Sequence, residues 1–103
     1  MTTYNKLVRD RIPDILEAKG KKYTVRQVGV GFEKGNYLRK KLVEETDEFL
    51  KEPSIEELAD VQEVVFALAE NMGFTRQDLE IVREAKVVQR GAFEDNWVLE
   101  EVI

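Results

Sequence analysis

Along most of the chain, hydrophobic residues recur every three or four positions, which is the spacing of one face of an α-helix. Three long helices are therefore predicted, over 36–51, 54–72 and 75–90. The last two begin at the capping residues Ser54 and Thr75, each followed three positions later by an acidic residue that completes a capping box. A glycine after each of these two helices ends it.

The N-terminal third and the last residues carry shorter elements. A helix is predicted over 11–19, with Pro13 in its first turn. The alternating, β-branched residues 23–28 predict a short strand, the three glycines between 29 and 35 predict a loop, and 97–103 predicts a second short strand. The fold class is therefore all-α, with room for a short β pair between these two segments.

A chain of 103 residues has room for one domain, 1–103, and not for two. Three long helices are few for a closed bundle, so we expect a homodimer or homotetramer that completes a four-helix or larger bundle. The N-terminal segment lacks the apolar stretch of a signal peptide, and charges interrupt every apolar stretch too often for a membrane span. We therefore expect a cytoplasmic protein with no membrane partner.

The chain contains no cysteine and no histidine. Thiol nucleophiles, thiolate metal sites, Ser-His triads and histidine-zinc sites are thereby excluded. Any chemistry must use carboxylates, Lys, Arg, Tyr, hydroxyl groups or a hard metal ion bound by oxygen.

Charge is distributed unevenly along the chain. Residues 1–41 carry eleven basic and four acidic residues, 42–63 carry one and nine, and 64–103 carry four and eight. The net charge of −5 argues against a nucleic-acid partner. The acidic block, residues 42–63, indicates a site for metal ions, and the basic residues within 1–41 indicate an anion bound beside those ions. The alternative is that the two charged stretches are solvated faces that pair with each other.

Two carboxylate pairs lie at helical i, i+3 spacing: Glu45 with Glu48, and Glu57 with Asp60. Residues three apart share one face of a helix. On antiparallel neighbouring helices the four carboxylates converge, and oxygen ligands alone favour Mg²⁺ or Mn²⁺ over zinc or copper. The alternative is that they are solvated glutamates, which are common on exposed helices.

The second long helix is apolar over most of its circumference, so we expect it to be central and largely buried. Glu56, Glu63 and Glu70 repeat every seven residues and form a stripe that we assign to solvent. Glu57 and Asp60 lie outside this stripe. Buried carboxylates need a partner, because desolvating them alone costs several kcal/mol, roughly.

The order E-E-x-x-E, formed by Glu44, Glu45 and Glu48, is followed by E-x-x-D, formed by Glu57 and Asp60. This order resembles the signature of the all-α NTP pyrophosphatase superfamily, which includes MazG, the dimeric all-α dUTPases and phosphoribosyl-ATP pyrophosphohydrolase. The acidic motif by itself is moderately specific.

Three further segments, 4–13 (YNKLVRDRIP), 57–61 and 86–93, resemble a small MazG-like subgroup described as house-cleaning phosphoribosyl-ATP pyrophosphohydrolase-like proteins. The resemblance thus covers nearly the whole chain. Ala92 stands where a second glycine is expected, which affects only the local turn. The resemblance implies a helical bundle and Mg²⁺-dependent hydrolysis of a nucleoside triphosphate between the α and β phosphates, giving a nucleoside monophosphate and pyrophosphate.

The resemblance also implies roles for individual residues. The metal ligands would be Glu45, Glu48, Glu57 and Asp60. Either Glu44 or Glu48 would orient or deprotonate the attacking water. The phosphate-binding residues would be Lys6, Arg9, Arg11, Lys86 and Arg90, with surface charge as the alternative for each. The aromatic residues that can stack on a base, although each is better explained as core, are Tyr37, Phe93 and Trp97.

Two other classes stay open. A nonenzymatic helical interaction dimer would share the amphipathic helices but would not need Glu57 and Asp60 outside the solvent stripe. A phosphoribosyl-ATP pyrophosphohydrolase would share the acidic site but not the opening over residues 5–13. Turnover of nucleoside triphosphates, of phosphoribosyl-ATP or of neither separates the three.

Overall fold

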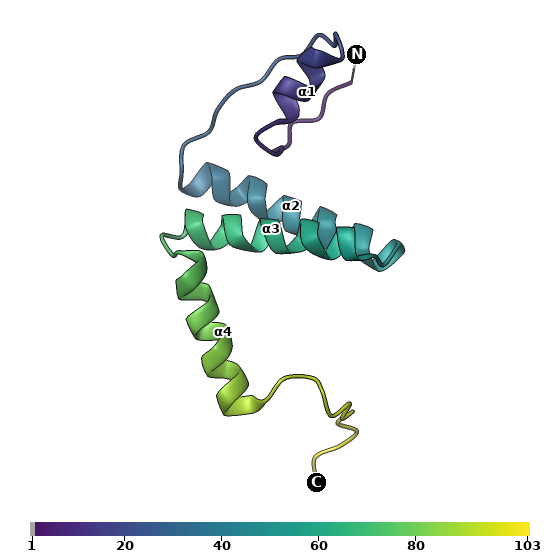
Figure 1. The fold of residues 1–103 in the computed structure, drawn as a ribbon, viewed down its shortest axis with the longest axis vertical. Coiled ribbons are helices and arrows are strands. Elements are labelled where there is room, and N and C mark those ends of the chain that lie inside the picture. The colour runs from purple at the N-terminus through teal and green to yellow at the C-terminus, as the bar shows by residue number, and fades with distance from the viewer. Residues whose placement is uncertain (1) are drawn as a thin grey trace.

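The computed structural model describes residues 2–103, and this part of the chain is all-helical (Figure 1). The helices are α1 (Ile12–Ala18), α2 (Phe32–Lys51), α3 (Ile55–Asn71) and α4 (Arg76–Arg90). The all-α prediction is confirmed, and the three long helices lie where the hydrophobic spacing predicts them. None of the helices within residues 2–103 is both long and apolar enough to cross a membrane.

α2 and α3 form an antiparallel pair at the centre of the molecule, joined by a short connection through Pro53 (Figure 1). The small apolar core lies between them. Leu38 of α2 is 2% exposed, and Val64 and Ala69 of α3 are buried as well. A short connection and a narrow apolar seam are enough to hold two helices side by side, and they fix which faces meet.

α2 begins at Phe32, four residues before the predicted start, so the predicted loop at Gly35 is wrong. Gly35 is buried inside the helix, and a Cβ atom there would lie 3.2 Å from the side-chain nitrogen of Asn71. Asn71 accepts a hydrogen bond from the Gly31 N–H at 2.8 Å and donates one to the Gly31 carbonyl at 3.0 Å. The glycines therefore allow the end of α3 to approach the start of α2 closely.

The N-terminal caps of α3 and α4 differ in whether the capping box is complete. Thr75 and Asp78 form the complete capping box predicted for α4. At α3, the Ser54 hydroxyl accepts a hydrogen bond from the Glu57 N–H at 3.1 Å, but the capping box is incomplete, because the Glu57 carboxylate lies in an acidic cluster instead.

The predicted β pair is absent, because residues 2–103 contain no strand. The segments 23–28 and 97–103 are extended but lie on opposite sides of the α2–α3 pair (Figure 1). A strand needs a neighbour for its backbone groups, and within one chain neither segment reaches the other. The periodicity predicts an extended conformation, whereas the helices between the segments decide whether they can meet.

α4 leaves the helical pair at a steep angle and contacts it only near its own start (Figure 1). Arg76, at the start of α4, contacts three residues of α3. Its guanidinium lies 4.5 Å from the centre of the Phe66 ring and pairs with Glu63 at 3.4 Å and Glu70 at 3.2 Å. No residue of α4 is buried. The rest of α4 and the segment after it extend away from the core.

The chain is far from compact. Its radius of gyration is 17.9 Å, against about 13 Å for a compact chain of this length. The expected central burial of α3 is not found in the single chain, where Val64 and Ala69 are its only buried residues. Phe93 and Trp97, expected in the core, are 98% and 90% exposed. A single chain therefore leaves much of its apolar surface uncovered.

Candidate metal and phosphate site

Three carboxylates from the two central helices converge in the half of their shared seam that lies nearer the α2–α3 connection. Glu45 projects from α2, and Glu57 and Asp60 project from adjacent turns of α3. One oxygen atom of each lies within 4.8 Å of the others. The i, i+3 spacing brings Glu57 and Asp60 onto one face of α3, and the antiparallel packing brings that face to Glu45.

Hydrogen-bond donors do not reach every carboxylate oxygen of this cluster. Glu45 is 8% exposed, and Glu57 and Asp60 are half-buried. The Glu45 Oε2 and Glu57 Oε2 atoms are buried without a hydrogen-bond partner among residues 2–103. Burial raises the pKa of the Glu45 carboxyl and the charge of Glu48 raises it further, while Lys41 opposes the rise.

Buried acceptor atoms without donors are costly, because their hydration is lost and nothing replaces it. A divalent cation would satisfy both orphaned oxygens at once. Three carboxylates and no nitrogen or sulfur ligand form a donor set typical of Mg²⁺ or Mn²⁺. The residues present therefore fit such an ion, with Glu45, Glu57 and Asp60 as the group that would hold it.

Glu48 and Glu44 occupy different positions relative to this cluster. Glu48, predicted as a fourth ligand, is outside the group of three but lines the adjoining groove and lies close enough to raise the pKa of Glu45. Glu44 faces Lys6, whose ammonium donates a hydrogen bond to it at 3.0 Å. That bond lowers the pKa of the Glu44 carboxyl.

A groove of about 280 Å³ opens beside the cluster, between α2 and the segment before α1. Acidic and basic side chains line it together: the acids are Glu45, Glu48 and Asp60, and the bases are Lys6, Arg9 and Lys41. The Arg9 guanidinium donates a hydrogen bond to Asp60 Oδ1 at 2.6 Å. A site that combines three carboxylates with three basic side chains suits an anionic ligand that has a divalent metal ion bound to it. The carboxylates would bind the metal ion and the basic side chains would bind the anion.

The structure therefore brings Lys6 and Arg9 to the predicted site, although they stand 38 or more residues away from the acids they contact. The other three predicted phosphate-binding residues are not at the groove. Arg11 is exposed at the start of α1. Lys86 and Arg90 lie in the last turns of α4, which points away from the cluster (Figure 1).

Lys41 is the groove residue that the sequence reasoning missed. Its ammonium lies 3.4 Å from Glu45 and 3.7 Å from Glu44, and its side chain is 18% exposed. The signal was present in the sequence, because a lysine four residues before Glu45 shares its helix face. The solvent stripe is as predicted: Glu56 and Glu70 are exposed, and Glu63 is a partly exposed partner of Arg76.

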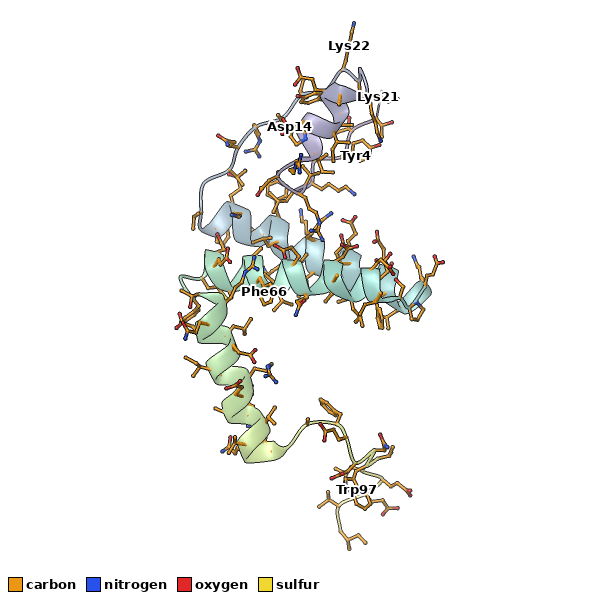
Figure 2. All side chains as sticks on the ribbon, in the orientation of Figure 1. Tyr4, Asp14, Lys21, Lys22, Phe66 and Trp97 are labelled. Atoms are coloured by element: carbon orange, nitrogen blue, oxygen red, sulfur yellow. The ribbon has the colours of Figure 1, made fainter. Side chains whose placement is uncertain are left out.

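The predicted base-stacking residues do not form part of the groove. Tyr37 is half-buried on α2, where its hydroxyl accepts a hydrogen bond from Arg26 at 3.2 Å. Trp97 lies far from α2 and α3, in the segment after α4 (Figure 2). Phe93 is in the same segment and, with Arg90, borders a separate open hollow there. None of the three predicted aromatic residues therefore lines the groove beside the carboxylates.

Comparison of the chain with protein-family models, with curated proteins and with solved structures gives no match.

Proposed function

We propose that this protein is a metal-dependent nucleoside triphosphate pyrophosphohydrolase that uses Mg²⁺, with Mn²⁺ as an alternative. The observation that carries the proposal is the pair of buried, unpartnered oxygens on Glu45 and Glu57, next to a groove that holds Lys6, Arg9 and Lys41. The acidic motif and the opening segment that resemble the all-α NTP pyrophosphatases support the same reaction.

The reaction adds one water across the anhydride between the α and β phosphates and releases a nucleoside monophosphate and pyrophosphate. When bound, the metal supplies positive charge that offsets the negative charge developing on the phosphate oxygens. The chain holds the ion through Glu45, Glu57 and Asp60, and Lys6 and Arg9 bind the phosphates through charge-assisted hydrogen bonds.

Glu48 is the better of the two predicted groups for activating water. Its carboxylate lines the groove, whereas Glu44 does not line it and is engaged by Lys6. A lowered pKa also makes Glu44 a weaker proton acceptor. In our proposal Glu48 takes the proton of the attacking water, and Glu44 positions Lys6.

Arg9 has two partners in this scheme. Its guanidinium pairs with Asp60. An ion bound by Asp60 would take over the neutralisation of that carboxylate and leave the guanidinium available for a phosphate oxygen.

The test is a panel of nucleoside triphosphates incubated with the protein, with and without Mg²⁺, in which pyrophosphate and orthophosphate are measured separately. We expect metal-dependent release of pyrophosphate with a nucleoside monophosphate. Release of orthophosphate with a diphosphate would reject cleavage between α and β. Turnover of phosphoribosyl-ATP alone would favour the biosynthetic hydrolase, and no turnover would favour a nonenzymatic interaction dimer.

A further inference from the structure

Two extended segments of this chain have strand-like sequences and no partner. Residues 23–28 alternate around Tyr23 and Val25, and residues 97–103 are rich in hydrophobic and β-branched side chains. Within residues 2–103, the backbone N–H and C=O groups of both segments form no hydrogen bonds. Such segments are templates for pairing with another chain.

The tail segment is also unusually apolar for a surface that meets water. Trp97 is 90% exposed, Leu99 80% and Val102 86%, and in the other segment Val25 is 61% exposed. The whole chain exposes 9550 Å², about 3,500 Å² more than a compact chain of its mass. Obligate interfaces bury about 2,000–5,000 Å² or more summed over both chains, so an excess of this size on each chain is ample for one.

The two segments are complementary in charge. We call residues 19–28 the basic segment and residues 92–103 the acidic tail. The basic segment contains four bases and no acid: Lys19, Lys21, Lys22 and Arg26. The acidic tail contains four acids and no base: Glu94, Asp95, Glu100 and Glu101. Opposite charges on two surfaces select the partner and orient it.

One chain cannot bring its own two segments together. Lys21 and Lys22 lie at one end of the molecule and Trp97 near the other, along an axis of 60 Å (Figure 2). The central helices separate them, and α4 directs the tail away from the basic segment (Figure 1). The surface complementary to each segment is therefore available only on a second copy of the chain.

We propose that the acidic tail of one copy pairs in extended conformation along the basic segment of a second copy, and that the second copy does the same in return. A two-fold axis forms both contacts at once, because each copy presents both surfaces. The proposal does not depend on the hydrolase activity. An anionic tail is a poor match for an anionic lipid surface, so the second copy is the occupant.

Charge reversal tests this pairing directly. In a tail variant, Glu100→Lys and Glu101→Lys leave the acidic tail with two acids and two bases; in a segment variant, Lys21→Glu and Lys22→Glu leave the basic segment with two bases and two acids. Each variant alone should dimerise about tenfold or more weakly than the wild type, because both of its contacts lose their net charge attraction. An equal mixture should dimerise more tightly than either variant, since the mixed dimer keeps one wild-type contact and pairs the exchanged charges in the other.

The matched control is Glu52→Lys with Glu56→Lys, which changes net charge as the tail variant does but at two exposed positions, the end of α2 and the first turn of α3. It should dimerise like the wild type in sedimentation equilibrium at micromolar concentration. A wild type that stays monomeric overturns the proposal. So do variants that dimerise normally, or a mixture no tighter than its separate components.

Trp97 supplies an independent readout, because it is the only tryptophan in the chain. Its emission should shift to shorter wavelength as protein concentration rises and the tail becomes covered, and the separate variants should lack this shift. A dimer in which Trp97 keeps the emission of an exposed indole would mean that the helices alone form the interface, and would overturn the proposal.

Discussion

Glu44 and Glu45 are neighbours in the sequence, yet their carboxyl pKa values move in opposite directions. A hydrogen bond from Lys6 lowers the pKa of Glu44, whereas burial and the charge of Glu48 raise the pKa of Glu45. Ionisation of Glu44 is favoured by a lysine, and ionisation of Glu45 is opposed by burial and by a like charge. At this scale the neighbours of a carboxylate, and not its identity, decide its role.

The raised pKa of Glu45 predicts a pH-dependent stability of the metal-free protein. The cost of ionising Glu45 is fully present above its raised folded pKa and disappears as pH falls through that pKa toward the ordinary value of 4.5. Glu45→Gln should therefore unfold at a higher denaturant concentration than the wild type at neutral pH, and this advantage should vanish in acid.

Urea unfolding of both proteins over a pH series, with a chelator present, measures this difference. Glu56→Gln, at an exposed position on the solvent stripe, is the control and should follow the wild type at every pH. A Glu45→Gln advantage that does not change with pH would show that packing, and not ionisation, causes it.

Asp60→Asn separates the metal interpretation from a surface-charge interpretation. The amide keeps the shape of the side chain but loses the charge that would bind a cation. Mg²⁺ should raise the melting temperature of the wild type by binding the folded state, and the variant should lose that rise together with hydrolysis. The metal-free variant should stay within about 1 kcal/mol of the wild type, because the Arg9–Asp60 pair is largely exposed.

Glu63→Gln is the matched control on α3. Glu63 contacts only Arg76 and lies outside the acidic cluster. It should keep both the response to Mg²⁺ and the activity. Equal effects of the two substitutions would mean that the division of α3 into a site face and a solvent face is wrong.

At the scale of the elements, the position of the site depends on how α2 and α3 are aligned. The connection at Pro53 joins them at one end, and the Asn71 side chain links them at the other through both backbone groups of Gly31. The absence of a side chain at Gly35 makes room for this contact. The register of the two helices, and hence the meeting of Glu45 with Glu57 and Asp60, follows from these two ends.

Asn71→Ala should therefore destabilise the helical pair. It leaves the Gly31 N–H without its partner, which costs about 1–3 kcal/mol for a partly buried group, and the Gly31 carbonyl keeps only the hydrogen bond from the Gly35 N–H. The melting temperature should fall by about 4–8 °C for each kcal/mol in a domain of this size. Gln62→Ala, at an exposed position on the same helix, should change the melting temperature little.

Thermal scans by circular dichroism compare the two variants. The Mg²⁺-induced rise in melting temperature should also become smaller in Asn71→Ala, because a looser helix register holds the three carboxylates less closely. An Asn71→Ala protein as stable as the Gln62→Ala control would mean that the link through Gly31 does not determine the register.

At the scale of the whole molecule, the single chain is an open structure with a small core. Its only buried hydrophobic side chains are Leu38, Val64 and Ala69 within residues 2–103, while Ile81, Val82 and Val88 of α4 are exposed. A core this small supplies little of the free energy that must offset the conformational entropy of folding. We propose that association between copies of the chain supplies the rest.

Stability should therefore depend on protein concentration. If the folded chain is stable only as an oligomer, its melting temperature rises as concentration rises, by mass action. Scanning calorimetry over a hundredfold range of concentration, roughly, would detect this. A melting temperature that does not change over this range, with a compact monomer in light scattering, would contradict the expected homodimer or homotetramer.

The sequence by itself determined the helices and their caps, because these depend on residues three or four positions apart. The spacing of hydrophobic residues predicts α2, α3 and α4, and the capping box at Thr75 is found as expected. The same local rule placed Glu57 and Asp60 on one face of α3, away from the Glu56, Glu63 and Glu70 stripe.

Only the tertiary structure decided which of these local features meet. Lys6 and Arg9 reach the acidic cluster, and Arg90 does not, because the path of the chain before α1 and the angle of α4 are set by contacts between distant residues. From the sequence alone Gly35 is predicted to lie in a loop, whereas the structure places it in α2, in close contact with Asn71. Strand-like segments stay unpaired for the same reason: periodicity specifies the shape of a segment, while its partner depends on packing across the whole molecule.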